Sequence, residues 1–430
     1  MITTMTARPH SVLRRSLEIA VTVCLLAACS DASPRPAGPS WLEYRGDLAR
    51  DGHPSAATLT TGDARTLGLA WSAHLDGAVD GTPAVVRGMV IAGTAAGTLY
   101  ALDSSSGKTI WSKRGFGGMS SSPTIAGDSV YVTTTTGHAL AFGLERGNLR
   151  WDWSGDKDWA IWASPVVYRD EVIIGVASPY GDQPLVAGRL YALDLAHGLV
   201  RWDMCLRAGC APGDGVWSTA AIDASGTAYV GVGNPDDAVL AFDAVTGKPK
   251  WWSPLYPDAG RDVDVGASPV VYMLDGREAI WQATVEGRFV ILDASDGAIR
   301  ASRPLVAGSA VHGLLASPAY DGTRFYVASA SPPTGLFAID GESGGTLWRH
   351  DTGLPGYSAP AVGNGVVVFG TGNVFGDLTT GSLVALSAAD GQVVWTYDTN
   401  SAVRSGPALV GKMVVVGDYA GDLMAFSPKH

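Results

Sequence analysis

Charged residues and basic clusters are scarce in this chain of 430 residues. Charged residues make up 17% of the sequence, against about 25% in an average soluble domain. The formal net charge is −11, and it becomes −13 when the first 28 residues, with Arg8, Arg14, Arg15 and Glu18, are left out. No basic run follows them. Because a polyanion is bound through clustered Lys and Arg, the sequence predicts no nucleic-acid ligand and disfavours a partner with a polyanionic surface.

Cysteine is also rare, with four in the whole chain. No Cys-x-x-Cys-His motif is present, so the sequence predicts no covalently bound haem. Cys24 and Cys29 belong to the N-terminal leader, which leaves Cys205 and Cys210. Redox-active pairs are more often Cys-x-x-Cys, and a zinc site would need further ligands nearby. We therefore expect a local structural disulfide between Cys205 and Cys210 in an oxidising compartment.

The N-terminus predicts export. Three arginines precede an apolar stretch, residues 19–28, that is too short to span a bilayer and has the order of a secretory signal. The segment Leu26-Ala27-Ala28-Cys29 resembles a bacterial lipobox, in which Cys29 would carry the lipid; an ordinary signal peptide is the alternative. We expect a signal peptide at 1–28, a Pro/Ser/Ala-rich tether at 29–40 and one folded domain at 41–430, held at the cell envelope through the lipid anchor alone.

Apolar residues at helical spacing are missing from the folded part, and a repeat takes their place. Its pattern is Ala-x-Asp-x-x-Ser/Thr-Gly-x-x-x-Trp, clearest at Ala101 to Trp111 and Ala241 to Trp251. The glycine is present in all seven complete copies: Gly107, Gly147, Gly198, Gly247, Gly297, Gly344 and Gly391. Six copies end in Trp, whereas the fifth has Ala301. An eighth copy stops at Leu423 to Ser427.

Each unit contains four short β-branched and aliphatic runs separated by Gly, Asp and Ser turns. Eight four-stranded units predict an all-β fold, the eight-bladed β-propeller. The last unit lacks its Trp strand, while Leu69 to Leu75 forms a Trp strand with no unit before it. These two segments should pair, so that N- and C-terminal strands close the ring and no sheet edge is left open there.

The repeat resembles the tryptophan-docking motif of the pyrroloquinoline quinone (PQQ) repeat superfamily, and Ala241 to Trp251 matches it at every fixed position. The resemblance covers residues 69 to 430. The superfamily contains quinoprotein alcohol dehydrogenases, including polyvinyl alcohol dehydrogenase-like members. It also contains a non-catalytic lipoprotein scaffold of the β-barrel assembly machinery. The fold does not choose between these functions.

The resemblance implies positions for a dehydrogenase site. It places Trp217 under the quinone, Asn234 beside calcium, and Asp262 or Asp264 as the base that takes the substrate hydroxyl proton. Each also has a purely structural explanation: Trp217 as packing between blades, Asn234 as a turn cap, and the aspartates as loop hydrogen-bond acceptors.

Three positions depart from the family pattern. The calcium-binding Glu falls near Asp182, which has a shorter reach. The family's ring of two adjacent cysteines falls near Gly117-Gly118, where this chain has no cysteine. The position of the basic residue that contacts the cofactor is occupied by Val285. A trianionic cofactor depends on such partners, because a buried charge without them is costly.

Two hypotheses follow. The first is a binding or scaffolding lipoprotein of the envelope that engages a protein partner; the departures favour it. The second is an oxidoreductase, a PQQ- and calcium-dependent alcohol dehydrogenase, with Trp217, Asn234 and Asp182 at the cofactor, calcium near Asn234, Asp264 and Asp182, and an external electron acceptor. Its substrate would be a small or polymeric alcohol.

Overall fold

The computed structural model describes residues 38–55, 57–257 and 260–429. The predicted signal peptide, the lipidation site Cys29 and most of the tether lie outside the described residues. Helix is confined, within the described part, to α1 (Thr61–Ala64) and the 3-10 turn η1 (Ala208–Cys210). Within the same ranges, no helix is long and apolar enough to cross a membrane.

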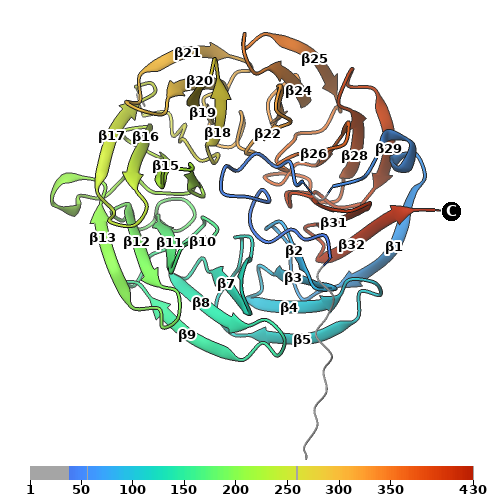
Figure 1. Cartoon of the computed structure of the whole chain (residues 1–430), viewed down its shortest axis with the longest axis horizontal. Helices are drawn as coiled ribbons and strands as arrows, with labels where there is room; N and C mark the ends of the chain where they lie inside the picture. The colour runs from blue at the N-terminus through green and yellow to red at the C-terminus, as the bar shows by residue number, and fades with distance from the viewer. Residues whose placement is uncertain (1–37, 56, 258–259, 430) are drawn as a thin grey trace, which may run out of the picture. The chain divides into compact units, whose positions relative to one another are not determined.

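In the described residues, thirty-two strands form eight antiparallel sheets of four, arranged as blades around a central axis (Figure 1). The first strand of each blade lies nearest the axis. Blades one to four are β2 (Ala84–Val86), β3 (Met89–Gly93), β4 (Thr98–Asp103), β5 (Thr109–Arg114); β6 (Thr124–Ala126), β7 (Ser129–Thr133), β8 (His138–Gly143), β9 (Leu149–Ser154); β10 (Val166–Tyr168), β11 (Glu171–Val176), β12 (Arg189–Asp194), β13 (Val200–Cys205); and β14 (Ala221–Ile222), β15 (Thr227–Val232), β16 (Ala238–Asp243), β17 (Pro249–Pro254). Blades five to eight are β18 (Val270–Leu274), β19 (Arg277–Ala283), β20 (Arg288–Asp293), β21 (Ile299–Pro304); β22 (Ala319–Tyr320), β23 (Arg324–Ser329), β24 (Gly335–Asp340), β25 (Thr346–Asp351); β26 (Ala361–Gly363), β27 (Val366–Gly370), β28 (Ser382–Ser387), β29 (Val393–Asp398); and β30 (Ala408–Val410), β31 (Met413–Gly417), β32 (Asp422–Pro428) with β1 (Leu67–His74).

The ring closes as the sequence predicts. β1 pairs antiparallel with β32, with Leu69 opposite Phe426 and Ala73 opposite Leu423. The eighth blade is therefore made from both ends of the folded chain (Figure 1). The predicted eight-bladed propeller and its closure are confirmed.

The repeat motif joins neighbouring blades through its tryptophan and its glycine. The Trp71 indole N–H donates to the Ser104 carbonyl of the next blade at 2.8 Å, and Trp111 donates to Leu144 at 2.9 Å. The next blade's glycine lies directly over the indole: a Cβ on Gly107 would stand 2.6 Å from Trp71 Cε3. The glycine is thus required twice, for its positive φ and for this close approach.

The blade that lacks the tryptophan is packed differently. Ala301 stands in the docking position of blade five, and the facing Gly344 meets the Arg303 side chain and Phe289 instead of an indole. Trp281, which is fully buried, stacks between Phe289 and Phe325 with ring centroids 4.9 and 4.8 Å apart. This aromatic stack fills the interface between blades five and six that a docked tryptophan fills elsewhere.

A segment before the first blade, residues 41–55 with 57 and 58, runs across the centre of the ring (Figure 1). Its backbone makes hydrogen bonds of 2.7–3.0 Å with residues of seven blades, and the pairs are Trp41–Val85, Leu42–Ile125, Leu48–Ile222, Ala49–Val271, Asp51–Tyr320, Gly52–Val362 and Thr58–Gly411. Two fully buried arginines reinforce it: Arg45 donates to the Pro318 carbonyl at 2.7 Å and Arg50 to the Ala220 carbonyl at 2.8 Å. We call this segment the plug; the sequence did not predict it.

Candidate functional site

The main cavity of the described residues lies on the propeller axis and has a volume of about 370 Å³, within the roughly 300–1,000 Å³ of small-molecule sites. Tyr44 of the plug lines it and donates to Ser317 Oγ at 2.9 Å, so the plug forms its floor. Tyr180, 67% exposed, lines it too, so the cavity opens to solvent.

Two tiers of residues from the start of each blade line this cavity. The lower tier comes just before the first strand of each blade and consists of Thr82, Ser122, Ser164, Thr219, Ser268, Ser317, Ala359 and Gly406. The upper tier lies two residues earlier and consists of Asp80, Ser120, Trp162, Trp217, Gly266, Leu315, Tyr357 and Arg404. The repeat therefore presents one residue per blade in each tier.

Hydroxyl groups tie the lower tier together. The backbone N–H of Ser122 donates to Ser164 Oγ at 2.9 Å, that of Ser164 to Thr219 Oγ1 at 2.9 Å, and that of Thr219 to Ser268 Oγ at 2.8 Å. The chain of bonds continues to Ser317. Because each bond joins one blade to the next, the lower tier fixes the positions from which the upper tier projects.

Trp217, predicted as the cofactor floor, is an upper-tier residue of blade four. Its ring lies nearly parallel to Trp162 of blade three, with centroids 5.9 Å apart and planes inclined by 15°. Trp162 is held in turn by its indole N–H, which donates to the Ser178 carbonyl at 2.9 Å. The two indoles thus bring aromatic rings from neighbouring blades to the cavity wall, and an aromatic ring can stack on a planar ligand.

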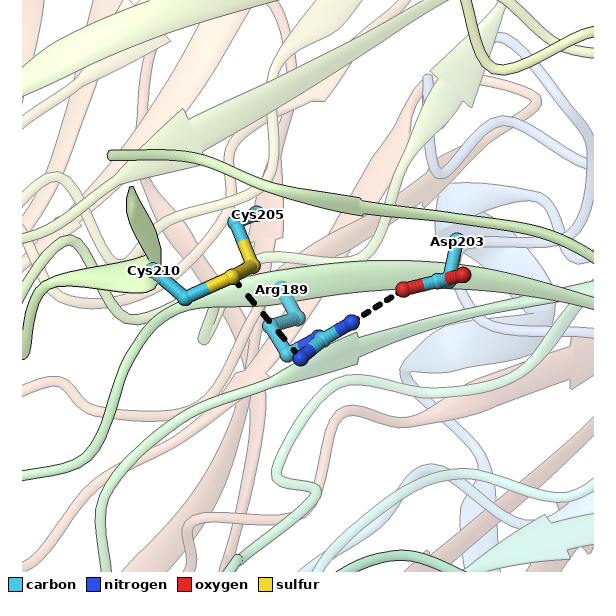
Figure 2. Close-up of a disulfide and its surroundings, with 4 residues drawn as sticks. All are labelled: Arg189, Asp203, Cys205 and Cys210. Carbon is cyan, nitrogen blue, oxygen red and sulfur yellow. Dashed lines mark hydrogen bonds and ion pairs between the residues drawn. A yellow bond between two sulfur atoms is a disulfide. The ribbon is translucent and has the colours of Figure 1, made fainter. Parts of the chain in front are cut away.

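The loop that carries Trp217 begins at a disulfide. Cys205, at the end of β13, is bonded to Cys210, as the sequence predicts. Figure 2 shows Arg189 beside it, hydrogen-bonded to Asp203 and 3.9 Å from Cys210 Sγ. The disulfide fixes the loop a few residues before Trp217.

Asn234 brings the two predicted catalytic aspartates together. Its backbone N–H donates to Asp264 Oδ1 at 2.8 Å, and its side-chain Nδ2 donates to Asp262 Oδ1 at 2.8 Å. Both carboxylates line the cavity. The Asn234 Oδ1 atom is buried and accepts no hydrogen bond within the described structure, so an acceptor without a donor lies beside two carboxylates.

Asp182 lines the same cavity from the connection between β11 and β12. Burial raises the pKa of Asp182, a hydrogen bond from Ser178 opposes this, and the nearby Asp262 carboxylate adds to it. Each residue predicted for catalysis, cofactor binding or calcium thus lies at one cavity, either on its wall or, for Asn234, bonded to two residues of the wall.

The structure shows the surroundings of the positions that depart from the family pattern. Val285 lines the cavity with an apolar side chain, 5% exposed. Gly117 and Gly118 lie away from the cavity wall, where a Cβ on Gly117 would stand 2.0 Å from Thr136 Oγ1. That glycine therefore serves the packing of blade two.

Sequence reasoning missed most of the upper tier, above all Asp80, Trp162 and Arg404. The signal that could have found them is the recurring Ser/Thr-Pro at the start of units, as at Thr82-Pro83 and Ser164-Pro165. Counting back two residues from that step gives the tier.

Eight four-stranded blades, tryptophan docking between blades and an axial cavity define a β-propeller of the PQQ-repeat class. The chain belongs to this family: the family model described as outer membrane protein assembly factor BamB matches residues 55–209 and 270–430. Residues 210–269, with Trp217, Asn234, Asp262 and Asp264, fall outside the match, so the family model leaves the roles of these residues open.

The curated relatives include alcohol dehydrogenases and an outer membrane assembly factor. The chain is 25% identical over 363 residues to a polyvinylalcohol dehydrogenase of Sphingopyxis sp., covering 68% of this chain and 56% of that protein. It is 25% identical over 325 residues to the quinohemoprotein alcohol dehydrogenase ADH IIB of Pseudomonas putida, covering 61% and 46%. Over 102 residues it is 34% identical to BamB of Salmonella typhimurium, covering 24% and 25%. The chain spans about half the length of the dehydrogenases it matches.

Solved structures show the same fold. The quinohemoprotein alcohol dehydrogenase of Comamonas testosteroni superposes with a TM-score of 0.77 at 18% identity, covering 92% of this chain and 81% of that one. BamB of Moraxella catarrhalis superposes with a TM-score of 0.65 at 17% identity, covering 84% and 99%. At these identities the likeness is one of fold alone.

Proposed function

We propose that this protein is an alcohol dehydrogenase of the quinoprotein type, which binds PQQ and calcium in its axial cavity. One observation carries the proposal: Trp217, Asn234, Asp262, Asp264 and Asp182 come from three blades and meet at one cavity. The departures in the sequence favoured a scaffold. The convergence of the residues reverses that preference, because a scaffold has no need to gather them.

The residues fit a calcium ion in part. Ca²⁺ takes about six to eight oxygen ligands, usually carboxylates and amide or backbone carbonyls. The acceptor Asn234 Oδ1, which has no donor, supplies one such oxygen beside Asp264, and Asp182 adds a carboxylate to the same cavity. Among the described residues no group of three or more His, Cys, Asp or Glu is positioned to hold a metal ion. The remaining ligands would therefore have to come from the cofactor and from water.

The residues also fit a planar cofactor. Trp217 and Trp162 supply an aromatic wall, and the lower tier supplies hydroxyls. PQQ would accept hydride from the alcohol carbon. The chain's own part is to orient the alcohol and to accept its hydroxyl proton on Asp262 or Asp264, both held by Asn234. An electron acceptor outside the described residues completes the proposal.

Reconstitution tests this function. Protein purified from the envelope fraction of an expressing host is incubated with PQQ and CaCl₂, passed through gel filtration, and assayed by dye-linked oxidation of primary, secondary and polymeric alcohols. We expect retained quinone absorbance, and turnover that falls by about 10²-fold or more in Asp262→Asn or Asp264→Asn. Asp275→Asn, in an exposed turn of blade five, is the matched control. Retention of no quinone would refute the proposal.

A scaffold at the cell envelope is the second candidate. It is favoured by Val285, which stands where the family has a basic side chain that contacts the cofactor. The family description and the BamB relatives point the same way and to the same location. Under either function we propose export by residues 1–28 and lipid attachment at Cys29. Palmitate labelling that persists in Cys29→Ala would show that the lipid is not attached at Cys29.

A further inference from the structure

One wall of the cavity, formed by blades eight and one, carries a basic and an acidic side chain side by side in the upper tier. Arg404 precedes β30 of blade eight and Asp80 precedes β2 of blade one, and these blades are neighbours in the ring (Figure 1). Among the described residues that line the cavity, Arg404 is the one Lys or Arg. The cavity therefore has a single cationic position.

The guanidinium of Arg404 has donors to offer. Within the described residues it forms no salt bridge; it lies near the Asp80 carboxylate and donates a hydrogen bond to the Tyr419 hydroxyl. A guanidinium has five N–H donors, so others remain for a ligand. Burial lowers the pKa of Arg404, but Asp80 and Tyr419 outweigh it and the net direction is upward, so the group stays charged. The lower tier beneath lacks hydroxyls, since Ala359 and Gly406 replace Ser or Thr there. Of the two tier residues that blade eight contributes, Arg404 and Gly406, Arg404 therefore supplies the side-chain hydrogen-bond donors.

Asp80 has an acceptor to offer. Its Oδ2 accepts from Ser120 Oγ at 3.1 Å. The Tyr419 hydroxyl lies against the same carboxylate, but Asp80 Oδ1 is buried and no donor of the described structure reaches it with hydrogen-bond geometry. A buried carboxylate oxygen without a donor is costly. The wall therefore presents a charged donor group and an acceptor that still needs a donor.

The opposite wall has the reverse character. Asp182, Asp262 and Asp264 come from the loops around blades three to five, across the ring from blades eight and one (Figure 1). These groups, with Asn234 Oδ1, attract a cation and repel a carboxylate. An anionic ligand that enters the cavity must therefore direct its free carboxylates toward Arg404.

PQQ has ends that match these walls. Its pyrrole end carries an N–H flanked by two carboxylates, and its other end carries the quinone oxygens, a pyridine nitrogen and the third carboxylate. We propose that Arg404 and Asp80 bind the pyrrole end, with Arg404 donating to a carboxylate and its positive charge offsetting the negative charge of Asp80, whose Oδ1 accepts the pyrrole N–H. The inference rests on the proposed function. It gives this chain a basic residue that binds the cofactor from blade eight. In blade five, the apolar Val285 supplies none.

Binding measurements test the assignment without turnover. PQQ is titrated into the purified protein with CaCl₂ while tryptophan fluorescence is followed, for the wild type, Arg404→Gln, Arg404→Lys and Asp80→Asn. We expect Arg404→Gln to weaken affinity about tenfold or more, Asp80→Asn to weaken it less, and Arg404→Lys to retain part of it, because Lys keeps the charge but lacks the planar fork. Arg349→Gln, exposed on β25, is the matched control. Far-UV circular dichroism checks that each variant folds.

The PQQ trimethyl ester separates charge recognition from packing. Without free carboxylates, the ester should bind the wild type and Arg404→Gln with equal affinity. If the wild type binds PQQ and Arg404→Gln binds it equally well, the assignment is wrong while the proposed function stands. If the wild type binds no PQQ with calcium, both are wrong.

Discussion

The contact between a motif glycine and the docked tryptophan predicts a measurable difference between two otherwise matched substitutions. Gly391 and Gly344 occupy the same motif position and have nearly the same φ, +70° and +67°. A Cβ on Gly391 would stand 2.5 Å from Trp348 Cε3. A Cβ on Gly344 would stand 3.2 Å from Arg303 Nε, because Ala301 leaves no indole there. The pair separates backbone strain from collision with the tryptophan.

The magnitudes follow from two terms. Alanine in a left-handed conformation costs about 1–2 kcal/mol at either site. Collision with a well-packed ring adds about 1–3 kcal/mol at Gly391 alone, since Trp348 is fixed by its hydrogen bond to the Ala388 carbonyl at 3.1 Å whereas an arginine side chain can move. We expect Gly344→Ala to lose about 1–2 kcal/mol and Gly391→Ala about 2–5 kcal/mol.

Equilibrium unfolding in guanidinium, followed by tryptophan fluorescence and by circular dichroism, measures both losses. The two probes are needed because a domain of this size can unfold through intermediates. Adding Trp348→Ala to each variant closes a double-mutant cycle, and a coupling energy should appear with Gly391→Ala but not with Gly344→Ala. Equal losses in the two single variants would refute the docking explanation of the glycine.

Two further predictions concern the plug and the disulfide. Burial, and then the neighbouring Asp47, raises the pKa of Asp51 from 3.8 to about 7. The folded state therefore holds this proton more tightly, and its contribution to stability is lost as pH rises from 3.8 through 7. Asp51→Asn should lose less stability than the wild type between pH 4.5 and 8 in thermal unfolding, and parallel profiles would contradict this. Reduction of Cys205–Cys210 should cost roughly 2 kcal/mol for so short a loop, seen as a lower unfolding midpoint in dithiothreitol. The variant Cys205→Ser/Cys210→Ser should not respond to dithiothreitol, and an equal response would show that the loss arises elsewhere.

The propeller could be predicted from sequence because its determinants are local and repeated. Each motif turn is made within a few residues, as where Asp243 Oδ1 accepts from the backbone N–H of Thr246 at 2.8 Å. Repetition then multiplied one local signal into eight blades. The closure by β1 followed from the same count.

The plug and the blade-eight wall could not be predicted because their contacts join distant parts of the chain. Arg50 meets the Ala220 carbonyl across 170 positions, and Asp80 and Arg404 meet only because the ring closes. The motif itself contains no trace of either contact. The same holds for Asn234, whose bonds to Asp262 and Asp264 decide that both aspartates, rather than one, face the candidate site.

The contacts that stabilise the ring and the side chains that line the cavity belong to different residues. Docking contacts such as Trp71 with Ser104 lie on the outer strands, and the plug closes the channel through backbone hydrogen bonds. The upper tier projects from above the lower-tier ring, and residues as different as Leu315, Gly266 and Arg404 occupy equivalent places in it. None of these three positions holds a docking tryptophan or the glycine that covers it, so the cavity wall can vary while the docking contacts stay the same. Ligand chemistry in this propeller is therefore set by what its eight upper-tier positions present, and here they combine one cation, one anion and three aromatic rings with the acidic loops of blades three to five.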